Sequence, residues 1–154
     1  MAGAAGRRYA SDGSQTNANP VDTTITLTSA STVRPVAYYF GVSCGVTAPA
    51  DNAILWTAQR CTAIGTGTAD TPQALDPGDP ASLATVTIDH TGEPTFTANA
   101  TLFNLCLNQR ATLQWFADAA GGLMAPATAN AGIGWFSTNT SYTGDVYVTV
   151  HWAE

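Results

Sequence analysis

Three aspartates lie close together in residues 65–82, a segment rich in glycine and proline: Asp70, Asp76 and Asp79. Carboxylates and loop carbonyls are the oxygen ligands that calcium prefers. The segment lacks the Asp-x-Asp-x-Asp-Gly order of the helix-flanked calcium loop. Solvated turn carboxylates are therefore the favoured interpretation, and the sequence predicts no metal and no cofactor.

The other reactive side chains do not form a catalytic pattern. His90 follows Asp89 in a predicted turn, and His151 falls on the outer face of a predicted strand. No serine lies in a Gly-x-Ser-x-Gly elbow, and no Cys or His pair has zinc-ligand spacing. The chain has no lysine, which excludes a phosphate-loop lysine and Schiff-base chemistry. We expect a protein that is not an enzyme.

Charge and cysteine usage limit the partners and the compartment. The formal net charge is −6 with only five basic residues, so the basic footprint of a nucleic-acid binder is missing. An odd number of cysteines (Cys44, Cys61 and Cys106) predicts free thiols in a reducing compartment. Neither a signal peptide nor a bilayer-spanning segment is expected. The sequence therefore predicts synthesis in a cytoplasm and no membrane partner.

Alternating apolar residues predict a single all-β domain of about eight strands and no amphipathic helix. The clearest pattern is in the last strand, where four apolar residues alternate with polar ones. A β-sandwich of jelly-roll type is the preferred fold, with an immunoglobulin-like sandwich as the alternative. The segments predicted to be extended are 24–28, 36–44, 53–61, 83–89, 96–100, 102–107, 112–117, 123–124, 132–137 and 145–152.

Two segments show no strand pattern. Residues 1–22 are small and polar, and they predict an extended N-terminal arm ahead of a β-sandwich domain at 23–154. Residues 65–82 have neither hydrophobic period and contain three prolines, so they predict a long loop. Asp76-Pro77-Gly78-Asp79 has the composition of a tight turn.

The aromatic residues leave one alternative open. Trp115, Trp135 and Trp152 fall on the apolar side of their strands, which favours core packing. Trp56 and Tyr142 are less certain and could instead form an exposed platform on which a sugar ring stacks.

Several stretches resemble small structural proteins of tailed bacteriophages. They are the central Pro/Gly/Asp segment 65–82, Leu-Asn-Gln-Arg-Ala-Thr-Leu-Gln-Trp at 107–115, Gly-Gly at 121–122, Pro-Ala-Thr-Ala-Asn-Ala-Gly-Ile at 126–133, the closing Val-His-Trp-Ala-Glu, and Gly-Arg-Arg-Tyr at 6–9. This resemblance implies a capsid decoration, or cement, protein on the virion exterior. The cysteine content and the Asn-rich arm depart from that family, which leaves the mode of attachment open.

The resemblance also implies partners and contact residues. It implies binding to the major capsid protein and a homo-oligomer, with a trimer favoured. We expect the arm and the central loop to make the capsid or inter-subunit contacts, so that deleting the residues before Pro20 weakens capsid binding without unfolding the domain. The alternative function is a carbohydrate- or receptor-binding β-sandwich module of a virion fibre. The candidate contact residues are Arg7, Arg8, Tyr9, Asp70, Asp76, Pro77 and Asp79.

Overall fold

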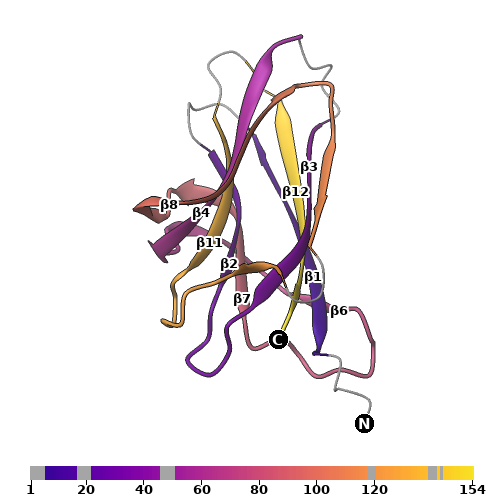
Figure 1. The fold of residues 1–154 in the computed structure, drawn as a ribbon, viewed down its shortest axis with the longest axis vertical. Coiled ribbons are helices and arrows are strands. Elements are labelled where there is room, and N and C mark those ends of the chain that lie inside the picture. Colours follow the sequence, from indigo (N-terminus) through magenta and orange to yellow (C-terminus); the bar gives the residue numbers. More distant parts are fainter. Residues whose placement is uncertain (1–5, 17–21, 46–50, 118–120, 139–141, 143) are drawn as a thin grey trace.

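Two antiparallel sheets pack face to face around a shared apolar core in the computed structural model (Figure 1). The structure describes residues 6–16, 22–45, 51–117, 121–138, 142 and 144–154. Every regular element in those ranges is a strand. The strands are β1 (Arg8–Thr16), β2 (Asp22–Thr28), β3 (Val36–Cys44), β4 (Ala53–Ala63), β5 (Thr66–Asp70), β6 (Gln73–Ala74), β7 (Thr85–Gly92), β8 (Thr95–Asn108), β9 (Leu113–Phe116), β10 (Leu123–Met124), β11 (Gly132–Thr138) and β12 (Asp145–Ala153).

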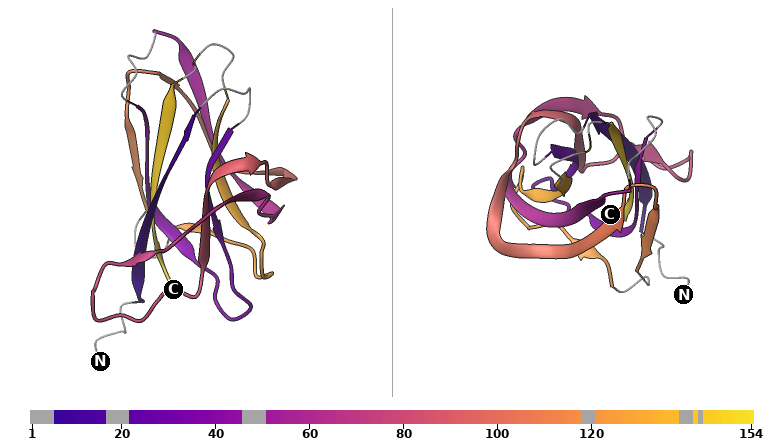
Figure 2. Two further views of the ribbon diagram at one scale, coloured as in Figure 1. Left: turned by 180° about the vertical axis from the view of Figure 1, so that it is seen from behind. Right: turned by 90° about the horizontal axis from the view of Figure 1, so that it is seen from above.

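Most strands that follow one another in sequence lie in opposite sheets; the exceptions are β4 and β5, β7 and β8, and β9 and β10. Sheet A has the order β10-β3-β12-β1-β6, and β9 also pairs with β3. Sheet B has the order β5-β7-β2-β11-β4-β8. The short strands β5 to β7 lengthen both sheets on one side, because β6 joins β1 whereas β7 joins β2. The two layers and the curvature of the strands around the core are visible from behind and from above (Figure 2). The all-β sandwich predicted from the sequence is confirmed.

The core lies between the two sheets and is built by strict alternation. In β12, the four inward residues Val146, Val148, Val150 and Trp152 are fully buried, as predicted. Opposite them, Ile25 and Leu27 of β2 and Trp135 of β11 complete the packing. Burying each large apolar side chain stabilises the fold by roughly 1.5–3 kcal/mol.

Alternation in residues 36–44 predicts an inward face of Val36, Tyr38, Phe40, Val42 and Cys44, and this face is wrong at the beginning of β3. Phe40 and Val42 are buried, as expected, but Tyr38 is only half-buried, while Ala37 lies in the core. The pairing of β3 with β12 skips Tyr38, since His151 pairs with Tyr39 and Trp152 pairs with Ala37. Such a bulge reverses the side of the sheet to which the following residues point.

The N-terminal arm predicted for residues 1–22 is also wrong for the part that the structure describes. Residues 8–16 form β1, which lies between β12 and β6 inside sheet A. Tyr9, Ser11 and Gly13 point inward and are buried. Two of these three residues are too small and polar to produce a hydrophobic period, so the pattern hides the strand. Residues 1–5 and 17–21 lie outside the described part of the chain.

The loop predicted for residues 65–82 contains two strands. Thr66–Asp70 pairs with β7, and Gln73–Ala74 pairs with β1. Gly65, the first residue of this segment, has a φ of 71°, and a Cβ there would lie 2.2 Å from the Gly92 carbonyl oxygen. Only glycine fits such a left-handed, crowded position without strain. The rest of the segment, 75–82, is irregular.

Strand β2 is buried on both faces, although its pattern predicts an exposed threonine face. Residues 90–96, which comprise the end of β7, the link between the strands and the start of β8, cover that face. The imidazole of His90 hydrogen-bonds Thr26, the carboxylate of Glu93 accepts hydrogen bonds from Thr23, and Phe96 packs against Phe136 on β11.

Candidate functional site

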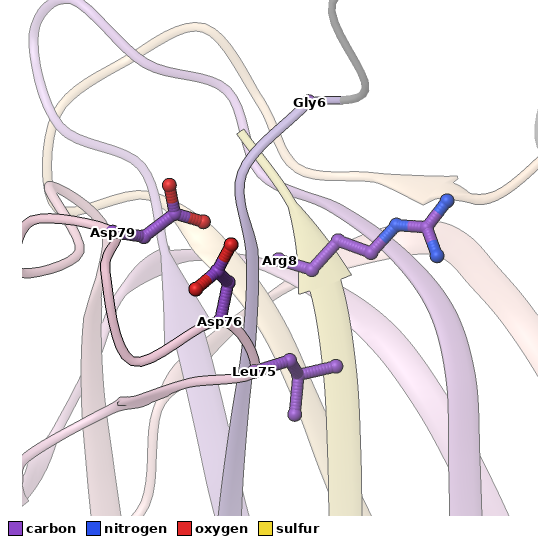
Figure 3. A pocket seen from close by; sticks show the side chains of 5 residues that line it. All are labelled: Gly6, Arg8, Leu75, Asp76 and Asp79. Carbon is purple, nitrogen blue, oxygen red and sulfur yellow. The ribbon is translucent and has the colours of Figure 1, made fainter.

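Three of the predicted contact residues line one surface hollow of about 390 Å³. Arg8 comes from β1, whereas Asp76 and Asp79 come from the segment after β6 (Figure 3). Gly6 and Leu75 complete the lining. The hollow therefore joins the N-terminal segment to the segment after β6, which is about seventy residues later in the sequence.

Backbone pairing between β1 and β6 brings these segments together. Tyr9 pairs with Ala74 in the sheet, and the amide of Leu75 donates to the Arg8 carbonyl at 2.8 Å. The hydroxyl of Tyr9 donates to the Pro80 carbonyl at 3.0 Å. The hollow is thus held by hydrogen bonds on both sides of the turn that carries its two carboxylates.

That turn has the geometry its composition predicts. The Gly78 amide donates to the Asp76 carboxylate at 2.9 Å, and the Asp79 amide donates to the Asp76 carbonyl at 2.9 Å. The first of these bonds is an Asx turn. Arg8 extends away from both carboxylates (Figure 3), and its guanidinium carbon lies 5.6 Å from the centre of the Tyr38 ring. Within the described residues, neither Asp76 nor Asp79 forms an ion pair.

A half-buried carboxylate, that of Glu154 just after β12, lies beside this hollow. Glu154 accepts hydrogen bonds from the amides of Leu83 (3.1 Å) and Ala84 (2.9 Å), from the Ser82 hydroxyl and from the Trp152 indole nitrogen (3.3 Å). Burial alone raises the pKa of this carboxyl group, but these four donors outweigh burial and hold its pKa below the ordinary value. The charged carboxylate therefore ties β12 to the segment that leads into β7.

The remaining predicted contact residues have different roles. Arg7 and Pro77 are exposed, and each is adjacent in sequence to a residue that lines the hollow. Tyr9 is fully buried and stacks on Trp152, with ring centres 5.9 Å apart, so its side chain contacts this chain's own core. Asp70 accepts a hydrogen bond from the buried Ser11 hydroxyl and does not line the hollow. The expected contact set is reduced to the exposed residues Arg7, Arg8, Asp76 and Pro77 and the half-buried Asp79.

A second surface feature, which we call the aromatic row, crosses the outer face of sheet A. Its members are Phe116, Tyr39, His151 and Tyr38. Tyr39 lies 4.8 Å from Phe116 and 4.7 Å from His151 between ring centres, and Tyr38 lies 6.2 Å from His151. Phe116 is 66% exposed. Alternation in the sequence predicts the outer position of His151 but not the row, because the same alternation directs Tyr38 into the core.

The sugar platform proposed for Trp56 and Tyr142 is wrong. Trp56 is 2% exposed and belongs to the core. Tyr142 is 6% exposed, and its hydroxyl donates to the Asp145 carbonyl at 3.1 Å. Neither ring presents a face on which a ligand could stack.

His90 is buried, not a surface turn residue as predicted. Its Nε2 lies 2.8 Å from the Thr26 hydroxyl oxygen, and its Nδ1 is buried without a hydrogen-bond partner. Burial lowers the pKa of the imidazole, which remains neutral near pH 7. Asp89, at a φ of 48°, turns the strand immediately before it. The hydrogen bond to Thr26 fixes this imidazole inside the protein, so the geometry gives it a structural role.

Two of the three cysteines, Cys44 and Cys61, are poorly suited to nucleophilic chemistry. Burial raises the pKa of Cys44 and Cys61, which makes these thiols poor nucleophiles. No cluster of three or more His, Cys, Asp or Glu side chains that could hold a metal ion occurs in the described ranges. Nor do those ranges contain a helix long and apolar enough to cross a bilayer.

Comparisons with known proteins identify no relative: no family model, no curated protein and no solved structure matches this chain.

Proposed function

We propose that this chain is a structural virion protein that binds the outside of a tailed-phage capsid and stabilises it, as a decoration or cement protein does. It would be made in the host cytoplasm, would act on the capsid exterior as a homo-oligomer, with a trimer favoured, and would contact the major capsid protein. The resemblance of the stretches quoted above first suggested this function. Two features of the folded chain, its strand order and one part of its surface, support this function.

The first support is the strand order. With β5, β6, β7 and β10 set aside, eight strands remain, in the orders β1-β12-β3-β9 and β2-β11-β4-β8. We infer from this order that the domain is a jelly roll, in which successive strands alternate between the two sheets except at β4 and β8, which are neighbours in one sheet. Jelly rolls are frequent in viral capsid proteins and lectins, so the fold suits a virion protein by analogy.

The second support, which carries the proposal, is the gathering of Arg7, Arg8, Asp76, Pro77 and Asp79 at one end of the sandwich. Two carboxylates without ion pairs in the described part of the chain are available to basic side chains of a partner. Ion pairs between Arg and carboxylates at an interface give geometric specificity. Hydrogen bonds from Leu75 to Arg8 and from Tyr9 to Pro80 hold the turn that carries the two carboxylates, which reduces the entropy lost on binding.

A capsid-binding assay tests the proposal. The protein is mixed with empty capsids of the phage that encodes it, and occupancy is measured by co-sedimentation and electron cryo-microscopy. We expect D76N/D79N to bind at least about fivefold more weakly, a loss of roughly 1 kcal/mol, because charge-assisted hydrogen bonds are lost. The matched control is D12N/D89N, which removes the same charge at two exposed positions outside the hollow. No binding by the unmodified protein would refute the function, and equal binding by both variants would refute the contact site.

A carbohydrate- or receptor-binding module of a virion fibre remains the second candidate, now on different residues. The aromatic row gives it an observation: four adjacent rings on an outer sheet face, with Arg8 at the end beside Tyr38. Exposed rings of this kind can stack against the apolar face of a sugar.

A glycan array separates this candidate from the first. If it holds, the purified protein retains specific glycans, and Phe116→Ser abolishes the signal while Leu83→Ser, at a similarly exposed leucine outside the row, leaves it unchanged. An empty array would reject the second candidate.

A further inference from the structure

Strands β8 and β9 leave one side of the sandwich incompletely closed. The side chains of β8 that lie opposite the core residues Ile54, Trp56 and Ala58 point inward, yet none of them is fully buried. The same holds for the two residues of β9 opposite Phe40 and Val42. We call these five residues the β8–β9 seam: Phe103, Leu105, Leu107, Leu113 and Trp115.

The seam is continuous across both sheets. Phe103 from sheet B and Trp115 from sheet A each contact Phe40, with ring centres 5.1 Å apart in both pairs. The turn at residues 109–112 joins the two strands, so their edges lie on the same side of the molecule. Leu105, at the middle of the inward set on β8, is 38% exposed. Core-facing side chains are therefore left in contact with water along this side.

Both strands also have unpaired backbone edges. In the described chain, β8 pairs only with β4, and β9 pairs only with β3. Proteins usually protect such edges with lysine, proline or inward charges, because an open edge recruits another strand. The fourteen residues of β8 and the four of β9 contain no charged residue and no proline. An unprotected edge beside exposed apolar side chains is typical of an interaction surface.

Charge indicates what covers this surface. The chain has a net charge of −6, so two copies repel each other through most of their surface. The seam is uncharged, so like charges do not oppose the approach of a second copy there, and that copy supplies open strand edges of its own. Nothing in the seam selects for a charged partner.

We propose that the β8–β9 seam is the surface through which copies of this chain associate with one another. Association completes the burial of the five seam residues and gives the free backbone edges partners. The contact sets which side of each copy faces its neighbour and leaves the end with the Asp76 and Asp79 hollow free. It assigns a surface to the homo-oligomer of the proposed function, and it does not depend on capsid binding.

Light scattering after size exclusion and sedimentation velocity test the proposal, at about 1–100 μM, a range that covers weak and standard interfaces. We expect the unmodified protein to be an oligomer. Leu105→Lys should weaken association at least about tenfold, because it buries an ammonium group in an apolar contact. The matched control, Leu83→Lys, has the same chemical change at a leucine that is 51% exposed outside the seam, and it should associate normally.

Circular dichroism and thermal melting establish that each variant is folded. If the Leu105→Lys variant is unfolded, association is measured with Leu105→Thr instead. Threonine suits an edge strand and still removes the apolar contact. An unmodified protein that is monomeric throughout this range, or a folded Leu105 variant that associates as strongly as the unmodified protein, would overturn the proposal. Capsid binding by a monomer would refute only the proposal that the seam joins copies of the chain. An oligomer without capsid affinity would refute only the proposed capsid function.

Discussion

Replacing Tyr9 with alanine is expected to lower the free energy of unfolding by about 3–5 kcal/mol, the usual cost of removing a fully buried aromatic side chain. Tyr9 is 0% exposed, stacks on Trp152 and donates to the Pro80 carbonyl at 3.0 Å. The alanine variant loses all three contributions and leaves a cavity between β1 and β12. Such a loss is a large fraction of the stability of a domain of this size.

The matched control is Tyr9→Phe, which keeps the ring and removes only the hydroxyl group. Its expected cost is about 0.5–1.5 kcal/mol, the net contribution of one hydrogen bond. Urea denaturation followed by tryptophan fluorescence measures both variants. An alanine variant as stable as the unmodified protein would show that Tyr9 belongs to an arm independent of the sandwich, as the sequence analysis predicted.

The position of Tyr9 also changes how the N-terminus can be tested. We expected a deletion up to Pro20 to spare the fold, but such a deletion removes β1 from between β12 and β6. The truncated protein should unfold, and its failure to bind capsids would then say nothing about contacts. The exposed side chains Arg7 and Arg8 must be tested by point substitution.

The strands that could be predicted from the sequence are those in which apolar residues occupy every second position. Strand β12 has valine or tryptophan at every inward position, and its register is therefore fixed. Strand β1 could not be predicted, because Ser11 and Gly13 occupy inward positions. They are buried by their neighbours: Gly13 lies so close to the Thr24 carbonyl that a Cβ would be 2.7 Å from it.

The surface features were harder to predict, because each depends on contacts distant in sequence. The hollow requires β6 to pair with β1, and nothing in the small, polar segment 66–70 or in Gln73-Ala74 indicates a strand or its partner. The aromatic row depends on the bulge at Tyr38, which period-two reasoning cannot detect. The tight turn at 76–79 was predictable, because Asp, Pro and Gly specify turn geometry locally.

Replacing Glu154 with glutamine is expected to destabilise the protein by about 1–3 kcal/mol at neutral pH, since hydrogen bonds to a charged acceptor are worth more than those to an amide. The carboxylate accepts from two backbone amides, a hydroxyl and an indole, and it connects β12 to residues 82–84. The glutamine side chain has a similar shape but only one acceptor oxygen, so it cannot satisfy all four donors. The control is Asp12→Asn, at an exposed carboxylate of β1, which should cost little.

The pH dependence gives this prediction its sharpest test. The pKa of Glu154 is lower in the folded protein than the ordinary value of about 4.3 that applies to the unfolded chain. The unfolded state therefore takes up the proton first as the pH falls, and the stabilisation present above the ordinary pKa is lost as the pH falls through the folded pKa. Glutamine does not titrate, so urea denaturation should show the stability difference between the two proteins shrinking as the pH is lowered from 6 towards about 3. His90, whose buried imidazole opposes protonation, destabilises both proteins equally in acid and cancels in the comparison. A difference that stays constant over this range would mean that the charge of Glu154 contributes nothing.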